Sequence, residues 1–131
     1  MSGRFLLDTN IIIGLLKREA SVVAAIAAAA EIFVPVIALG ELYFGAVRSS
    51  RPEANRAVLD QFVEGRIVLM CDLGVAREYG RLKSELKAQG TPLPENDMWI
   101  AAIALRYGLT VASRDRHFRE IRGLAVVAWN E

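Results

Sequence analysis

The feature that most constrains the fold of this chain is a short apolar run that stops at a carboxylate. Phe5, Leu6 and Leu7 form a continuous apolar stretch, as expected for a strand that is covered on both faces. Asp8 follows directly, and a helical segment begins at Ile11. Open parallel sheets bind ligands beyond the carboxyl ends of their strands, so Asp8 is a candidate metal ligand or catalytic group. Capping of the following helix is an equally good interpretation of Asp8 taken alone.

The rest of the chain alternates between apolar runs of strand length and segments with helical periodicity. The expected strands cover residues 4–7, 32–35, 67–70, 109–112 and 125–128. The expected helices cover residues 11–17, 20–30, 37–48, 52–64, 73–89 and 96–107. Strands that alternate with helices pair in parallel, which predicts an α/β fold of three layers with a parallel sheet between helices. A length of 131 residues suits a single domain of this kind.

Composition narrows the class of protein. With 53% apolar residues the chain is expected to form a globular core, and a net charge of +1 gives no overall signature of nucleic-acid binding. Asp8 interrupts the first apolar run, and Glu31 and Pro35 interrupt the region 20–40, so we expect neither a signal peptide nor a membrane span. Cys71 is the only cysteine, which excludes an internal disulfide and favours a reducing cytoplasm. We expect Cys71 to be a small buried apolar side chain.

Glu41 is a second acid in an unusual position. It lies in the helix after the second strand, where Ile37, Ala38, Phe44 and Gly45 share its face at helical spacing. Glu41 is therefore expected to project from a buried apolar face, where an ordinary solvent-facing glutamate would not be placed. The alternative is a favourable interaction with the positive N-terminus of the helix, which does not require that face.

Two further acids stand at the ends of expected elements. Asp97 lies in the first turn of a helix that Asn96 is expected to cap, which leaves Asp97 available for another role. Asp115 follows the fourth strand as Asp8 follows the first, with the hydroxyl of Ser113 beside it. Ordinary alternatives remain open for both, because a first-turn aspartate favours the helix dipole and a turn aspartate is commonly solvated.

Four such acids would define a site if the fold brings them together. Carboxylates about 5 Å apart repel by about 3 kcal/mol per pair at an effective dielectric of about 20, and protonation or a bound cation relieves this repulsion. Oxygen ligands favour hard cations such as Mg²⁺ or Mn²⁺. These ions polarise phosphoryl oxygens and lower the pKa of bound water. The chemistry that fits is hydrolysis of a phosphodiester by a metal-activated water.

The acids lie in four short motifs. These are Leu7-Asp8-Thr9-Asn10, Glu41-Leu42, Asn96-Asp97 followed by Ile100-Ala101-Ala102, and Ser113-Arg114-Asp115 with His117-Phe118. In order and spacing, over the whole chain, they resemble the PIN-domain ribonuclease family, and specifically the VapC-type toxins of bacterial toxin–antitoxin pairs.

The resemblance implies a fold, an activity and partners. The fold is a three-layer PIN-like domain with strand order 3-2-1-4-5, in which the first and fourth strands are neighbours and bring Asp8 to Asp115. The activity is that of a cytoplasmic endoribonuclease that uses Mg²⁺ or Mn²⁺. Its products carry 5′-phosphate and 3′-hydroxyl ends, because water and not the 2′-hydroxyl attacks. The partners are RNA, a VapB-like antitoxin that blocks the site, and a second copy of the chain in a homodimer or a larger toxin–antitoxin assembly.

The family pattern also assigns residue roles. The catalytic and metal-binding residues would be Asp8, Glu41, Asp97 and Asp115. Thr9 or Ser113 would position a ligand or a water, and Asn10 would support the site. Family members often carry asparagine or another polar residue at the position of Asp115, so its role is the least regular of the four.

Basic residues beside the last acid are candidates for RNA contacts. Arg114, Arg116 and His117 flank Asp115 and could contact phosphates near the cut. For His117, a structural role beside Phe118 is an alternative to a role in binding or proton transfer.

Two other functions compete with the nuclease. A phosphatase of the haloacid-dehalogenase kind also begins with an aspartate after its first strand, but it needs a second aspartate where this chain has Asn10. A catalytically idle PIN domain would serve only as an RNA- or protein-binding module, and the complete set of four acids argues against it.

Overall fold

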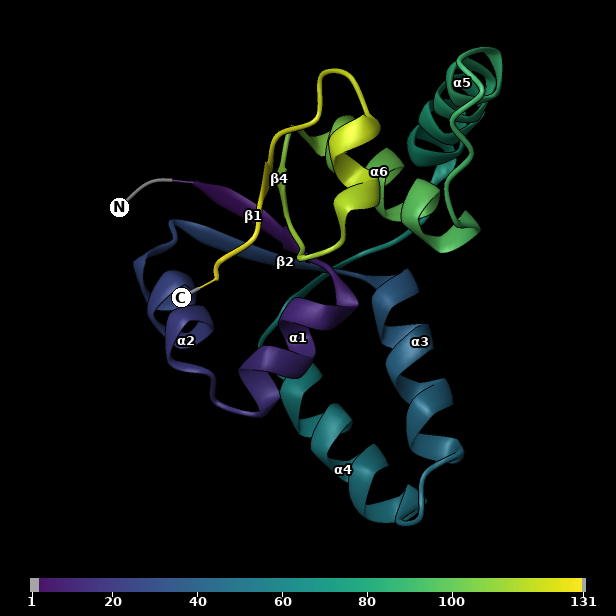
Figure 1. Ribbon diagram of the computed structural model, residues 1–131. Helices are drawn as coiled ribbons and strands as arrows, with labels where there is room; N and C mark the ends of the chain where they lie inside the picture. Colours follow the sequence, from purple (N-terminus) through teal and green to yellow (C-terminus); the bar gives the residue numbers. More distant parts are fainter. Residues whose placement is uncertain (1–2, 131) are drawn as a thin grey trace.

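A parallel sheet forms the centre of the protein, whose computed structural model describes residues 3–130 (Figure 1). Within these residues the strands are β1 (Arg4–Leu7), β2 (Glu31–Pro35), β3 (Ile67–Leu69), β4 (Thr110–Ala112) and β5 (Val126–Val127). Their order is β3-β2-β1-β4-β5, and every neighbouring pair is parallel. The expected strand order is confirmed, and the observed strands differ from the expected ones by a few residues at their ends.

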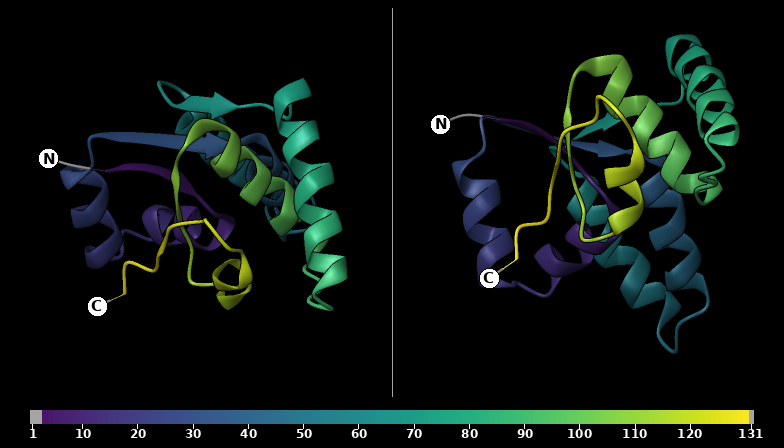
Figure 2. Two further views of the ribbon diagram at one scale, coloured as in Figure 1. Left: turned by 90° about the horizontal axis from the view of Figure 1, so that it is seen from above. Right: turned by 45° about the horizontal axis from the view of Figure 1, so that its top comes forward.

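Helices cover both faces of the sheet, as the alternating pattern predicts. They are α1 (Thr9–Leu16), α2 (Ala20–Ala28), α3 (Val36–Val47), α4 (Pro52–Val63), α5 (Leu73–Ala88) and α6 (Glu95–Tyr107), with a 3-10 turn η1 (Arg116–Glu120) before β5. Figures 1 and 2 show α5 and α6 on one side of the sheet and α1, α2 and α4 on the other. The expected three-layer α/β/α architecture is confirmed. No helix among residues 3–130 is both long enough and apolar enough to cross a membrane.

Adjacent residues of β1 serve opposite faces of the sheet. Leu6 belongs to the buried cluster that includes Leu82 of α5 and Ile103 of α6. Leu7 belongs to the second cluster, which includes Ile11 of α1. Both leucines are completely buried, because successive strand residues point to opposite faces and each face here is covered by helices. Truncating either to alanine would cost about 2–5 kcal/mol of stability.

Strand pairing brings the carboxyl ends of β1 and β4 together. Leu7 and Ala112 are partners in the parallel ladder, so Asp8 and Ser113 leave the sheet side by side. The Asp8 backbone N–H continues the ladder by donating to the carbonyl of Ala112 at 2.9 Å. On the other side of β1, β2 ends at Pro35 and α3 follows without a loop. Two of the sequence motifs therefore follow the carboxyl ends of neighbouring strands, and the helix that carries Glu41 starts from the same end of β2.

Two local predictions are wrong. Cys71 is exposed and not buried, because it lies in the connection between β3 and α5, outside both buried clusters. Asn96 does not cap α6: the helix begins one residue earlier, at Glu95, and its N-cap position is taken by Pro94, which has no side-chain donor or acceptor. The end of α6 follows the expected rule, since Gly108 adopts the left-handed conformation (φ 65°) that glycine tolerates best.

Candidate functional site

Asp8 lies at the bottom of the site and is nearly inaccessible to solvent. Its Oδ1 accepts a hydrogen bond from the Thr9 backbone N–H at 2.8 Å, so Asp8 does cap α1. Its Oδ2 accepts from the Ser113 hydroxyl at 2.7 Å, across from β4. Burial raises the pKa of Asp8, the two hydrogen bonds oppose this, and the charges of Glu41 and Asp115 raise it further. The capping interpretation of Asp8 is therefore confirmed, and its role as a metal ligand or catalytic group stays a prediction, which the nearby charges of Glu41 and Asp115 favour.

Glu41 reaches the same place from α3. Its Oε1 accepts a hydrogen bond from the Thr9 hydroxyl at 2.6 Å. The expectation that its helix face is buried is wrong: Glu41 itself is exposed, and Phe44 on the same face is 64% exposed. The buried residues of α3 are Ala38, Leu39 and Ala46. Of the residues expected to share the face of Glu41, only Ala38 is therefore fully buried, while Phe44 and Gly45 are exposed.

Asp97 and Asp115 both contact the same imidazole nitrogen of His117. Nδ1 of His117 lies 3.1 Å from Oδ2 of Asp97 and 2.9 Å from Oδ1 of Asp115. One ligand atom from each of the three residues lies within 4.8 Å of the others. Burial, opposed by the His117 hydrogen bond and reinforced by the charges of Asp115 and Asp8, raises the pKa of Asp97 to about 6. The hydrogen bond to Asp97 in turn raises the pKa of His117.

A polar network joins the two sides of the site. The Ser113 hydroxyl, which donates to Asp8, also accepts from the Asp115 backbone N–H at 2.9 Å. The Asn10 amide nitrogen lies 3.4 Å from both Asp8 Oδ2 and Ser113 Oγ, and the Asn10 carbonyl oxygen accepts from the Arg114 backbone N–H at 3.2 Å. Of the three residues expected to support the site, Asn10 and Ser113 thus lie between the acids that follow β1 and β4, whereas Thr9 joins Asp8 to Glu41.

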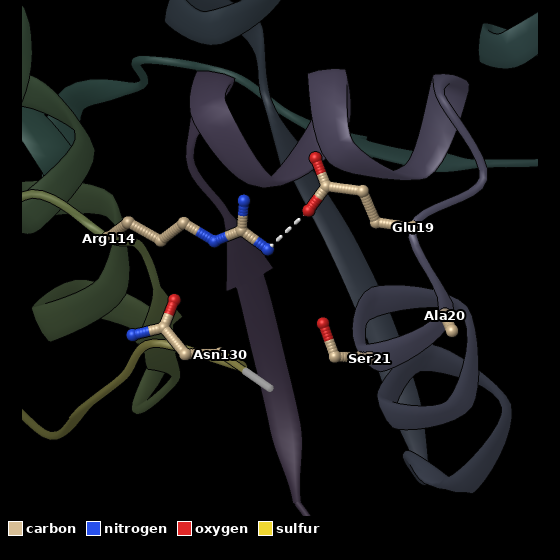
Figure 3. Close-up of a pocket in the computed structure, with 5 residues that line it drawn as sticks. All are labelled: Glu19, Ala20, Ser21, Arg114 and Asn130. Carbon is tan, nitrogen blue, oxygen red and sulfur yellow. Dashed lines mark ion pairs between the residues drawn. The ribbon is translucent and has the colours of Figure 1, made fainter.

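The basic candidates for RNA contacts are placed differently from one another. Arg116 is exposed, and His117 is half exposed and hydrogen-bonded to two acids. Arg114 pairs with Glu19 at 2.7 Å and not with an acid of the site; Figure 3 shows its side chain extending from the β4–η1 loop to Glu19. The alternative that His117 serves chiefly to pack beside Phe118 does not account for its two acid contacts. Sequence reasoning missed Glu19 altogether, because no motif or spacing marked it.

The four acids gathered here, Asp8, Glu41, Asp97 and Asp115, are called the acid cluster below. Among residues 3–130 no lysine or arginine forms an ion pair with any of them, and the one basic side chain that contacts them is His117, which is cationic only when protonated. Burial is the main cause of the raised pKa values of Asp8 and Asp97, and the negative charges of neighbouring acids raise both further. A set of carboxylate oxygens fits a hard divalent cation, so the residues present are suited to hold such an ion.

Comparison with known proteins decides the family. The family model described as "PIN domain" matches residues 5–124, which span all four motifs. The chain belongs to the PIN-domain family.

Relatives of this PIN domain are VapC proteins. Ribonuclease VapC2 of Haemophilus influenzae is 35% identical over 96% of this chain and 98% of its own length. The tRNA(fMet)-specific endonuclease VapC of Shigella flexneri is 33% identical over 97% and 98%. Among solved structures, the DNA-bound VapBC complex of Salmonella typhimurium contains a chain that superposes with a TM-score of 0.90 at 32% identity, over 97% of this chain and 98% of that one. The PIN domain described here is thus of the VapC type.

Proposed function

We propose that this PIN domain is the toxin of a toxin–antitoxin pair, an endoribonuclease that hydrolyses RNA phosphodiester bonds in the cytoplasm. The observation that carries the proposal is the acid cluster, in which residues far apart in the sequence face one another without a lysine or arginine partner among residues 3–130. Membership of the PIN family and full-length similarity to VapC ribonucleases support the same activity. A single domain would be sufficient for the reaction.

The cofactor in this proposal is Mg²⁺ or Mn²⁺, and Asp8, Glu41, Asp97 and Asp115 would hold it. A bound divalent ion would polarise the scissile phosphate and lower the pKa of the attacking water. The other residues hold the ligands in place: Thr9 fixes Glu41, and Ser113 fixes Asp8.

Attack by water would leave a 5′-phosphate and a 3′-hydroxyl. The His117 imidazole contacts Asp97 and Asp115, and its protonated form would balance part of their negative charge. Arg116, exposed beside it, is placed to contact an RNA phosphate.

The partner proposed for this toxin is a VapB-like antitoxin, in a homodimeric or larger assembly. The solved relatives include VapBC complexes of Salmonella typhimurium and Haemophilus influenzae. A surface groove of about 470 Å³ runs between α1, α3 and α4, and its apolar lining includes Ile13, Leu16 and Val58. Thr9 and Glu41 lie at the edge of the same groove. An apolar segment of the antitoxin bound there would end beside the acid cluster and could block it.

The test is RNA cleavage by the purified protein and by its Asp8→Asn variant. Asparagine keeps the size of the side chain and an acceptor for the Thr9 N–H, so the variant should fold while cleavage falls at least about 100-fold. A chelator should abolish wild-type cleavage, and added Mn²⁺ should restore it. Asp60→Asn on α4, an exposed aspartate outside the acid cluster, is the matched control and should cleave normally.

Three results would refute the nuclease proposal. They are full activity of Asp8→Asn, cleavage that persists in excess chelator, and products with 2′,3′-cyclic phosphate ends. An idle binding module would instead bind RNA or a partner, leave RNA intact, and show no heat of Mn²⁺ binding in calorimetry.

A further inference from the structure

One ion pair links the β4–η1 loop, which carries Ser113 and Asp115, to the α1–α2 loop, which the proposed reaction does not use. Nη2 of Arg114, from the β4–η1 loop, lies 2.7 Å from Oε1 of Glu19, from the α1–α2 loop (Figure 3). The two side chains are only 29% and 39% exposed, and Nε of Arg114 is enclosed without a hydrogen-bond partner among residues 3–130. The Arg114 side chain therefore extends toward Glu19 at the start of α2.

The backbone conformation of the α1–α2 loop places Glu19 beside Arg114. Arg18 adopts the left-handed conformation (φ 58°) that usually requires glycine. Its N–H donates to the carbonyl of Leu15, and the next N–H, that of Glu19, donates to the carbonyl of Gly14, which is the hydrogen-bond pattern of a Schellman motif. A Cβ atom on Gly14 would stand 3.2 Å from the Val22 side chain and 3.4 Å from the Glu19 carboxyl group, so the Glu19 side chain packs closely against α1.

The other half of the pair is joined directly to the site. The Arg114 backbone N–H donates to Oδ1 of Asn10, whose amide nitrogen contacts both Asp8 and Ser113. Ser113 and Asp115 are the chain neighbours of Arg114, and the Asp115 N–H donates to the Ser113 hydroxyl. A shift of the Arg114 backbone would therefore move Ser113, which hydrogen-bonds to Asp8, and Asp115, which is itself a member of the acid cluster.

We infer that Arg114 is a positioning residue: its ion pair with Glu19 holds the β4–η1 loop against α1, so that Asp115 keeps its place in the acid cluster. Its effect on catalysis rests on the proposed nuclease function, but its effect on the loop does not. A partly exposed ion pair contributes little to global stability, so removing it should leave the fold intact and change the geometry of the site. Misplacing a catalytic group by about 1 Å can reduce a rate up to about 100-fold.

The first measurement is independent of activity. Backbone amide exchange of Arg114 and Asp115 should be protected in the full-length protein, and Glu19→Gln and Arg114→Met should each lower this protection by about 3- to 5-fold, the range that a partly exposed ion pair can supply. The matched control is Glu31→Gln, which breaks the Arg4–Glu31 pair at the opposite end of the strands and should leave both amides protected. Unchanged protection in Glu19→Gln would overturn the inference, whether or not the protein cleaves RNA.

The second measurement separates positioning from RNA contact. Positioning predicts that Glu19→Gln and Arg114→Met behave alike: kcat falls about 10-fold, while KM and the affinity for RNA in chelator stay unchanged. An arginine that contacts phosphate predicts opposite effects, with weaker and less salt-dependent RNA binding in Arg114→Met and tighter binding when Glu19→Gln releases the guanidinium.

The reversed pair, Glu19→Arg with Arg114→Glu, should recover part of kcat relative to either reversal alone. Opposite effects of the two single variants on RNA affinity would overturn the positioning role. Absence of cleavage by the wild type would instead refute the nuclease proposal, and the exchange measurement would still decide the role of the pair.

Discussion

Replacing Asp97 by asparagine is expected to make the protein more stable while abolishing cleavage. The Asp97 side chain is only 13% exposed, and burial together with the charges of Asp115 and Asp8 raises its pKa to about 6 from an ordinary 3.8. At about 1.4 kcal/mol per pKa unit, ionised Asp97 costs the folded state about 3 kcal/mol near pH 7.5 without divalent cations. Asparagine removes the charge and keeps the shape.

The net gain should be smaller than this. A carboxylate in the first turn of α6 interacts favourably with the helix dipole, by about 0.3–1 kcal/mol, and the amide loses that interaction. The amide oxygen would also accept a weaker hydrogen bond from His117 than the carboxylate does. We therefore expect the free energy of unfolding to rise by about 1–2 kcal/mol and the thermal midpoint by about 3–8 °C.

The pH dependence has a definite sign. The protonated form of Asp97 favours the folded state, so its contribution to stability is fully present below 3.8 and is lost as pH rises through about 6. The pKa of His117 is also raised, so its contribution is present below 6.5 and is lost as pH rises through its higher folded-state pKa. Wild-type stability should therefore fall from about pH 4 to above pH 6.5, and fall less in Asp97→Asn.

The assay is urea unfolding followed by circular dichroism across this pH range in chelator, repeated with Mn²⁺. The cation should stabilise the wild type and not Asp97→Asn, because binding to the folded state alone adds stability. Asp60→Asn is the control and should match the wild type in both conditions. The reasoning is refuted if Asp97→Asn is less stable than the wild type near neutral pH, or if its pH profile is unchanged.

Three further predictions concern single side chains. Thr9→Val removes the hydroxyl that donates to Glu41 without changing side-chain size, so kcat/KM for RNA should fall about 10-fold, whereas Thr91→Val, outside the site, should have no effect. Cys71 is exposed, so one equivalent of a thiol reagent should react with the native protein; reaction only after denaturation would contradict the structure. Arg18→Gly relieves a left-handed arginine and should raise the thermal midpoint by a few degrees, about 0.5–1 kcal/mol, and a lower midpoint would show that the loop is not strained.

Local sequence patterns were sufficient for much of the fold. Apolar runs such as Phe5 to Leu7 predicted the strands, and their alternation with helical periodicity predicted parallel pairing between two helical layers. These predictions succeed because a strand buried on both faces must be apolar at every position, whichever neighbours it has. The strand order itself came from the family resemblance, since periodicity does not say which strands are adjacent.

The environment of individual side chains was harder to predict. Helical spacing identified the residues that share a face with Glu41, but exposure depends on what packs against that face, and Phe44 proved to be open to solvent. Cys71 was placed in the interior by its residue type, yet its segment runs over the surface between β3 and α5. Residue type predicts an average environment, whereas the packing of distant elements sets the actual one.

The sequence by itself determined that this chain folds as an α/β PIN domain and which four acids its motifs contain. Only the tertiary structure decided which partner each of the neighbouring side chains contacts. Arg114 and His117 stand three residues apart in one basic stretch, but the first turns to Glu19 and the second to Asp97. The direction of a long charged side chain is set by its nearest partner in space. Folding brings that partner close from a distant segment of the sequence.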